Sequence, residues 1–160
     1  MKTNEHNPTV RDIMTKKVIS VRPDTPILEV HKVIFEHNFS GVPVADKSNR
    51  LVGLVTEYDL ITKGSAIHLP TFQKVISELR VYSKDKRDFR KDIAEITKLT
   101  AQDVMNDDPL TVSDTANLAE VIDAFQKHHR VNPILVVDNS NKVVGVVSRY
   151  DVLKVFEFIK

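Results

Sequence analysis

The chain carries the same motif twice. Residues 53–59 read Gly-Leu-Val-Thr-Glu-Tyr-Asp, and residues 145–151 read Gly-Val-Val-Ser-Arg-Tyr-Asp. The stretches before the motif recur as well, because Asp-Ile-Met at 12–14 returns as Asp-Val-Met at 103–105. A duplicated unit tends to pack against its own copy. We therefore expect two related units that place two copies of one polar motif around a pseudo-twofold axis.

The bulk composition narrows the class of protein. At 160 residues the chain fits one compact domain or two small intimate ones. A net charge of +1 and an aromatic content of 6% argue against nucleic acid or an anionic membrane as a partner. The absence of cysteine fits a reducing compartment. Because no apolar run approaches the roughly 20 residues that span a bilayer and no signal peptide is visible, the expected location is the cytoplasm.

Hydrophobic spacing predicts the order strand, helix, strand, strand, helix in the first copy. We expect a helix with Thr25 as its N-cap and Pro26 at its first position, and a second helix that opens at Thr56. Ile27, Val30 and Ile34 would lie on the apolar face of the first helix. The expected strands are residues 18–21, 42–45 and 51–55.

The second copy repeats this order. A helix is expected to begin near Ser113 or Asp114, and a closing helix is expected to open at Ser148. The expected strands are residues 110–112, 134–137 and 143–147. The pattern predicts an α/β fold, with residues 63–100 as a helical insert between the copies.

The junction between the last strand and the closing helix of each copy holds polar groups suited to a nucleotide. A hydroxyl, Thr56 or Ser148, stands where the helix begins, and a carboxylate, Asp59 or Asp151, follows three residues later. Free N–H groups and the helix dipole at such a terminus attract a phosphate. Two carboxylate oxygens accept the hydroxyls of a ribose, as acidic residues do in dinucleotide-binding folds. One motif is therefore able to hold the sugar–phosphate part of a nucleotide.

The same four residues also fit a purely structural interpretation. A serine or threonine followed three residues later by an acid forms a capping box, which starts helices in ordinary proteins. Capping boxes prefer Glu or Gln at the third position, whereas both copies here use Asp. We interpret the repeated Asp as a sign of ligand binding, and a cap in the empty state is compatible with it.

Together the repeated pieces resemble the cystathionine-β-synthase (CBS) domain. The element order, the Asp-Ile-Met and Asp-Val-Met openings, Gly-Val-Pro-Val at 41–44 and the two junctions carry the resemblance, which covers about residues 10–62 and 101–158. It implies a CBS domain at 8–62, an insert at 63–100 and a second CBS domain at 101–160. In this family two domains pack as a tandem module that often dimerises. The clefts between the domains bind adenine nucleotides or, less often, S-adenosylmethionine.

The resemblance assigns roles to particular positions. The ribose-binding acids of the family match Asp59 and Asp151, and its phosphate contacts match Thr56, Ser148, Ser40 and Asn132. The positions that match adenine contacts are Val18, Ile19, Ser20, Val42, Pro43, Pro109, Leu110, Ile134 and Leu135. The second copy departs from the pattern, because Asn-Pro-Ile-Leu at 132–135 replaces Gly-Val-Pro-Val. We therefore expect its base pocket to differ in shape.

Cations near the two copies are open to two interpretations. Lys16 and Lys17 precede the first base-reading segment, where the second copy has Asp107 and Asp108. This asymmetry favours polyphosphates at the first cleft, but two exposed turns explain the same residues equally well. Arg130, at the end of a helix, is placed either to reach a phosphate or to favour the helix dipole from solvent.

No motif points to catalysis or to a metal. Four glycines leave no glycine-rich phosphate loop, no Ser–His–acid order can be argued, and the histidines lack metal-ligand spacing. We expect no enzyme, no catalytic residue, no metal and no required cofactor. Tyr58 and Tyr150, inside the motifs, are expected to pack rather than to stack on a base.

These observations favour a regulatory module that senses AMP, ADP or ATP in the clefts between the repeats. Signalling would follow from a shift in the population of two conformations. The expected partners are a second copy of the chain and an unidentified regulated protein, and neither nucleic acid nor a membrane is expected. A constitutive dimerisation or scaffold module with empty clefts is an alternative from another class, and a sensor of S-adenosylmethionine is a second.

Overall fold

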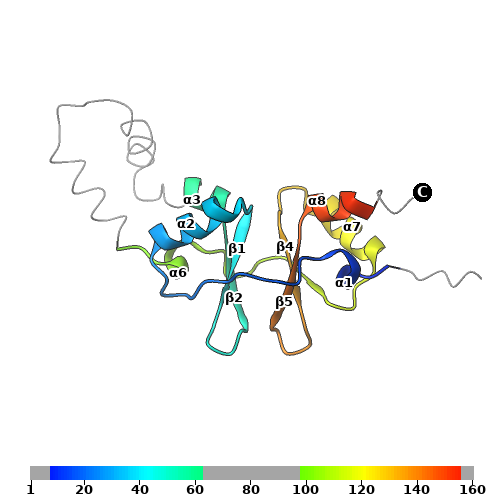
Figure 1. Cartoon of the computed structure of the whole chain (residues 1–160), viewed down its shortest axis with the longest axis horizontal. Coiled ribbons are helices and arrows are strands. Elements are labelled where there is room, and N and C mark those ends of the chain that lie inside the picture. The colour runs from blue at the N-terminus through cyan, green and yellow to red at the C-terminus, as the bar shows by residue number, and fades with distance from the viewer. Residues whose placement is uncertain (1–7, 63–97, 156–160) are drawn as a thin grey trace, which may run out of the picture. The chain divides into compact units, whose positions relative to one another are not determined.

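The computed structural model describes residues 8–62 and 98–155 (Figure 1). The helices are α1 (Val10–Ile13), α2 (Ile27–His37), α3 (Glu57–Thr62), α6 (Ala101–Val104), α7 (Leu118–Lys127) and α8 (Arg149–Leu153). The strands are β1 (Gly41–Ala45), β2 (Leu51–Thr56), β3 (Thr111–Ser113), β4 (Ile134–Val137) and β5 (Val143–Val147). The predicted insert, apart from residues 98–100, lies outside the described residues. Both repeats consist of mixed helices and strands.

The chain divides into two compact units, each of which is discontinuous in sequence. Unit 1 gathers the described residues of Met1–Ile19, Lys47–Leu51 and Pro109–Lys160. Unit 2 gathers those of Ser20–Asp46 and Val52–Asp108. Each unit has its own apolar cluster, so each is described by itself.

Unit 2 is built around α2 and the pair β1–β2. The predicted apolar face of α2 is confirmed, since Ile27, Val30 and Ile34 are all buried. Asn38 ends the helix in the left-handed conformation (φ 53°), which asparagine tolerates better than most residues. All of β1 is buried, and it pairs with β2 in a two-stranded sheet.

Two local predictions for the first copy are wrong. The expected strand at 18–21 is reduced to one parallel bridge between Val21 and Val44. Helix α2 is capped by Pro26 rather than by Thr25. The reason for the later start is tertiary, because the backbone of this stretch pairs with residues 99–101: the N–H of Ile27 donates to the Leu99 carbonyl at 2.9 Å.

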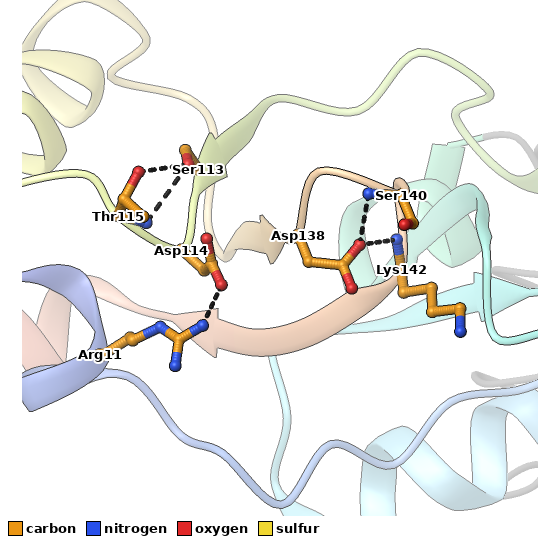
Figure 2. A network of polar contacts seen from close by, with 7 residues as sticks. All are labelled: Arg11, Ser113, Asp114, Thr115, Asp138, Ser140 and Lys142. Carbon is orange, nitrogen blue, oxygen red and sulfur yellow. Dashed lines mark hydrogen bonds and ion pairs between the residues drawn. The ribbon is translucent and has the colours of Figure 1, made fainter.

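Unit 1 is built around a three-stranded sheet in the order β3-β4-β5. Strand β3 is parallel to β4 and β5 is antiparallel to it. Asp138 closes the β4–β5 turn by accepting from the backbone N–H groups of Ser140 and Lys142 at 2.8 and 2.9 Å (Figure 2). The Lys142 hydrogen bond is the main reason why the pKa of Asp138 lies below its usual value.

Helix α7 begins at a different cap from the predicted one. The cap is Asn117, in a reciprocal box with Glu120, and not Ser113 or Asp114 as predicted. The Ser113 hydroxyl lies 2.8 Å from that of Thr115 in a local turn before the helix. The N–H of Asp114 donates to the Val137 carbonyl at 3.0 Å, so this stretch continues the sheet and delays the helix.

The opening segment of each repeat packs with the other repeat. In unit 1, α1 lies against β5, Val10 is fully buried in the cluster formed by the second repeat, and Arg11 forms an ion pair with Asp114 (Figure 2). In unit 2, Ala101 and Val104 of α6 are buried among residues of the first repeat. The compact unit in space and the repeat in sequence are therefore different sets of residues.

Candidate functional site

In unit 2, the predicted acid and hydroxyl meet where β2 runs into α3. The Asp59 Oδ2 atom accepts from the Thr56 N–H at 3.0 Å and from the Thr56 hydroxyl at 2.6 Å. The N–H of Asp59 lies 3.2 Å from the same hydroxyl oxygen. Asp59 is only 7% exposed. The carboxylate is thus held rigidly at the edge of the core, with a hydroxyl fixed against it.

Unit 1 repeats this geometry where β5 runs into α8. Oδ2 of Asp151 accepts from the N–H of Ser148 at 2.9 Å and from its hydroxyl at 2.7 Å. The other carboxylate oxygen, Oδ1, accepts from the Lys154 ammonium at 3.0 Å. Asp151 is 6% exposed, so both predicted ribose acids are buried to the same degree.

One argument from the sequence is wrong. The same reciprocal box, with Asp at the third position, also occurs at Thr9 with Asp12 and at Thr100 with Asp103. The use of Asp in place of Glu therefore does not separate a ligand site from an ordinary cap. Burial does separate them, because Asp12 and Asp103 are exposed whereas the acids of the two junctions are buried.

The residue after each hydroxyl carries opposite charge in the two units. Glu57 is an exposed residue whose carboxyl is partly screened from water, and this desolvation raises the pKa of Glu57 above its ordinary value. A hydrogen bond from the Glu57 backbone lowers the pKa, and the negative charge of Asp59 raises it further. Arg149 holds the equivalent place in unit 1. Its guanidinium donates to the His129 carbonyl and lies 6.0 Å from the Phe125 ring centroid.

In unit 2, the other predicted residues gather around β1. The Ser40 carbonyl accepts from the N–H of Glu57 at 3.2 Å, which places Ser40 beside the Thr56 junction. The N–H of Val21 donates to the Pro43 carbonyl at 2.9 Å, so Ser20 lies next to that strand. Val42 and Pro43 are both fully buried. Their side chains therefore offer no surface to solvent.

In unit 1, most of the second-copy residues lie at one end of the sheet. The N–H of Leu135 donates to the Leu110 carbonyl at 3.3 Å, and Ile134 pairs with Val147, one residue before the Ser148 junction. The Asn132 side chain accepts from the N–H of Arg149 at 3.2 Å. Pro109 is half-buried at the start of the last segment of unit 1, and Ile134 and Leu135 are fully buried.

The residues predicted to contact the ligand at the first copy are divided between the two units. Val18 and Ile19 are half-buried and belong to unit 1, whereas Ser20 belongs to unit 2. Lys16 and Lys17 are exposed; they follow residue 15, whose backbone pairs with that of residue 146 in β5. Arg130 is exposed in the turn after α7.

Several features escaped the sequence interpretation. Lys154 was detectable as a cation three residues after Asp151, a spacing that brings side chains together on a helix. No sequence signal announces the pair of Arg11 with buried Asp114, which are 103 positions apart. The expectation that Tyr58 and Tyr150 pack is wrong, since they are 68% and 67% exposed.

A hollow of about 330 Å³ lies on unit 1, and none of the predicted base contacts lines it. Its lining residues are Ile122, Phe125, Gln126, Arg149, Val152 and Leu153. Within residues 8–62 and 98–155, no group of three potential metal ligands is found. None of the helices described here has the length and apolar character needed to cross a membrane.

Comparison with known proteins places this geometry in a family. The sequence model of the CBS domain matches residues 10–65 and 101–157, which include both junctions. The chain belongs to the CBS domain family. The two matches make it a tandem CBS pair, and its α/β fold is that of solved CBS pairs.

Three relatives illustrate the similarity. The CBS domain-containing protein CBSX1, chloroplastic, from Arabidopsis thaliana is 30% identical over 95% of this chain and 67% of its own length. A crystal structure of CBSX2, also from Arabidopsis thaliana, in complex with AMP is 27% identical, with a TM-score of 0.70 over 95% of this chain and 98% of that one. The CBS domain of a CBS domain containing membrane protein from Sphaerobacter thermophilus is 30% identical, with a TM-score of 0.72 over 92% and 87%.

The chain spans different shares of its curated relatives. It covers 67% of CBSX1, but only 23% and 40% of two further relatives, both from Methanocaldococcus jannaschii.

Proposed function

We propose that the chain is a non-catalytic regulatory module that binds AMP, ADP or ATP at its two Thr/Ser-x-x-Asp junctions. The observation that carries the proposal is the burial of Asp59 and Asp151, in contrast to the exposed acids of two otherwise identical caps. A cap gains nothing from a buried carboxylate, because removing a charge from water costs free energy. The AMP complex of CBSX2, at 27% identity, supports adenine nucleotides as the ligand class.

Each group at the junction then has a role. The buried carboxylate accepts the ribose hydroxyls, which replace part of its present hydrogen bonding. The hydroxyl of Thr56 or Ser148 turns from the carboxylate toward a phosphate oxygen. The half-buried Val18, Ile19, Pro109 and Leu110 stay our candidates for contacts to the base, and so do the buried strand residues of β1 and β4.

The test is isothermal titration of the purified chain with AMP, ADP, ATP and S-adenosylmethionine. Asp59→Ala and Asp151→Ala should each weaken nucleotide binding about tenfold or more, the usual effect of losing hydrogen bonds to a charged group. Asp103→Ala is the matched control: it removes the same reciprocal box from an exposed cap, and it should leave binding unchanged.

Each alternative has its own outcome. If S-adenosylmethionine is the only compound that releases or absorbs heat, then S-adenosylmethionine, and not a nucleotide, is the ligand. No heat and no rise in melting temperature with any of the four would favour the constitutive scaffold, since a ligand that binds the folded state must stabilise it. Equal losses in all three variants would mean that the acids act only as caps.

Regulation would work through a population shift. A nucleotide changes the balance between two conformations only by the difference in its affinity for them. We propose that this shift is transmitted to a separate regulated protein.

A homodimer is supported by exposed apolar side chains on the helices of each unit. Leu28, Phe35 and Tyr58 of unit 2 are 55%, 77% and 68% exposed, and Tyr150 and Leu153 of unit 1 are 67% and 59% exposed. Large exposed apolar groups of this kind mark interaction surfaces. Sedimentation velocity should therefore show a dimer that Phe35→Glu weakens; a monomer at all concentrations would contradict it.

A further inference from the structure

Two residues at equivalent positions of the repeats carry opposite charges outside any ion pair. Glu57 is the first residue of α3 in unit 2, Arg149 is the first residue of α8 in unit 1, and both are exposed. Neither pairs with an opposite charge in the part of the chain that the structure describes. The Arg149 guanidinium donates to uncharged carbonyl oxygens, those of His129 and Val131. Each unit therefore presents one charge that an outside partner is free to match.

The surfaces beside these two charges differ in shape. In unit 1, α7 and α8 line the hollow of about 330 Å³, whose walls are mostly apolar side chains (Figure 1). The repeat relates α7 to α2, since Glu-Val at 120–121 matches Glu-Val at 29–30. Gln126, which lines the hollow, therefore corresponds to Phe35 of α2. The Phe35 side chain is 77% exposed, so one repeat has a hollow where the other has an aromatic ring in solvent.

We infer that the α2–α3 surface of one copy of the chain binds the α7–α8 surface of a second copy, with Phe35 in the hollow and Glu57 beside Arg149. The inference rests on the homodimer of the proposed function and specifies which surfaces meet in it. A cavity of about 150 Å³ holds a benzene molecule, so the hollow has room for a phenyl ring. Because every copy carries both surfaces, a closed pair forms this contact twice.

Electrostatics favours this pairing over contacts between like surfaces. Two α7–α8 surfaces would bring two Arg149 side chains to one interface, and two α2–α3 surfaces would bring two Glu57 side chains together. Like charges at an interface repel and select against that arrangement. The unlike contact places a cation beside an acid and an exposed aromatic ring against apolar walls. Central aromatic residues of this kind carry much of the binding free energy at protein interfaces.

The experiment is a charge exchange followed by sedimentation velocity of the full chain at low salt. Arg149→Glu and Glu57→Arg, each alone, should raise the dimer dissociation constant about tenfold or more, because each creates a like-charge contact. The two changes combined in one chain should return the constant close to that of the unsubstituted chain. An equimolar mixture of the two single variants should also dimerise, because each substituted side chain then faces the opposite charge on the other copy.

Further variants test the shape of the contact and control for net charge. Phe35→Ala removes the ring, and Gln126→Phe places a ring in the hollow, so both should weaken the dimer. Lys142→Glu changes the net charge as Arg149→Glu does, but at an exposed position in the β4–β5 turn, and it should leave the constant unchanged. Melting curves establish that each variant is folded. Arg149→Gln replaces Arg149→Glu should the latter melt early, and it should weaken the dimer to a smaller extent.

The pairing and the homodimer fail in different ways. If the unsubstituted chain is a dimer that neither charge reversal weakens, the pairing is wrong and the homodimer stands. If the reversals weaken the dimer and either the double variant or the mixture fails to recover it, Glu57 and Arg149 do not face each other between copies, and the pairing is again wrong. A chain that is monomeric at all concentrations overturns both. Nucleotide binding at the junctions is measured independently by titration.

Discussion

A methionine sulfur lies over the glycine in the last strand of each repeat. A Cβ atom added to Gly145 would lie 2.2 Å from the Sδ atom of Met14. A Cβ added to Gly53 would lie 2.6 Å from the Sδ of Met105 and 2.8 Å from the carbonyl oxygen of Asn106. The two glycines are needed for close approach and not for an unusual backbone angle, since none of the described glycines has a positive φ.

The two glycines should respond differently to substitution. Gly145→Ala should lower the free energy of unfolding by about 1 kcal/mol, within the usual range for overpacking, because the flexible Met14 side chain can move. Gly53→Ala should cost about 2–3 kcal/mol. The Asn106 carbonyl cannot move away, since it accepts from the N–H of Leu54 at 2.9 Å. Urea unfolding gives both values.

A double-mutant cycle distinguishes the two causes. Met14→Ala should remove most of the cost of Gly145→Ala when the two changes are combined. Met105→Ala should remove little of the cost of Gly53→Ala, because the backbone contact stays. Equal relief at both sites would show that the side chains alone set the constraint.

At the scale of the element, the sequence predicts best what depends on neighbours in the chain. The face of α2 and the start of α8 at Ser148 follow from helical spacing and capping chemistry, and the structure agrees. The start of α2 and the location of α1 depend on partners about 75 and 100 positions away, which leave no local pattern. Burial likewise decides that the caps with Asp59 and Asp151, and not the two with exposed acids, are the site candidates. A four-residue motif does not encode burial.

The α1 segment is a single element held by a few contacts, so its stability can be tested by itself. The N–H of Val10 donates to the Ala116 carbonyl at 2.8 Å, and Arg11 pairs with Asp114, which is 6% exposed (Figure 2). Arg11→Ala should leave a buried carboxylate without its cation and loosen α1 locally. We expect the amides of Val10 and Thr15 to exchange about tenfold faster by mass spectrometry, with little change at Val21.

Arg22 supplies the matched control in unit 2. Its guanidinium donates to the Ala45 carbonyl at 3.1 Å. Arg22→Ala should speed exchange around Val21 and Ala45 and leave Val10 protected. Acceleration at Val10 by both variants would mean that the segments do not open separately.

At the scale of the whole molecule, each repeat depends on the opening segment of the other repeat, because α1 packs with the second repeat and α6 packs with the first. Val10 is fully buried and belongs to the apolar cluster of unit 1, together with Val121, Ile134 and Val147. The duplicated sequence suggests two self-sufficient repeats. The packing instead makes the second repeat incomplete without residues near the N-terminus, so a cut between the repeats also removes part of a core.

A fragment of residues 109–160 tests this dependence. It lacks Val10, which is fully buried, and Met14, which is partly buried against the same cluster. Losing large apolar side chains from a core costs up to about 2–5 kcal/mol each, which is comparable to the whole stability of a small domain. The fragment alone should unfold in urea without a cooperative transition. A synthetic peptide of residues 8–19 should restore a cooperative transition, and the same peptide with Val10→Asp should not. A sharp transition from the fragment alone, at the midpoint of the intact chain, would show that the repeat folds independently and that α1 is only an attachment.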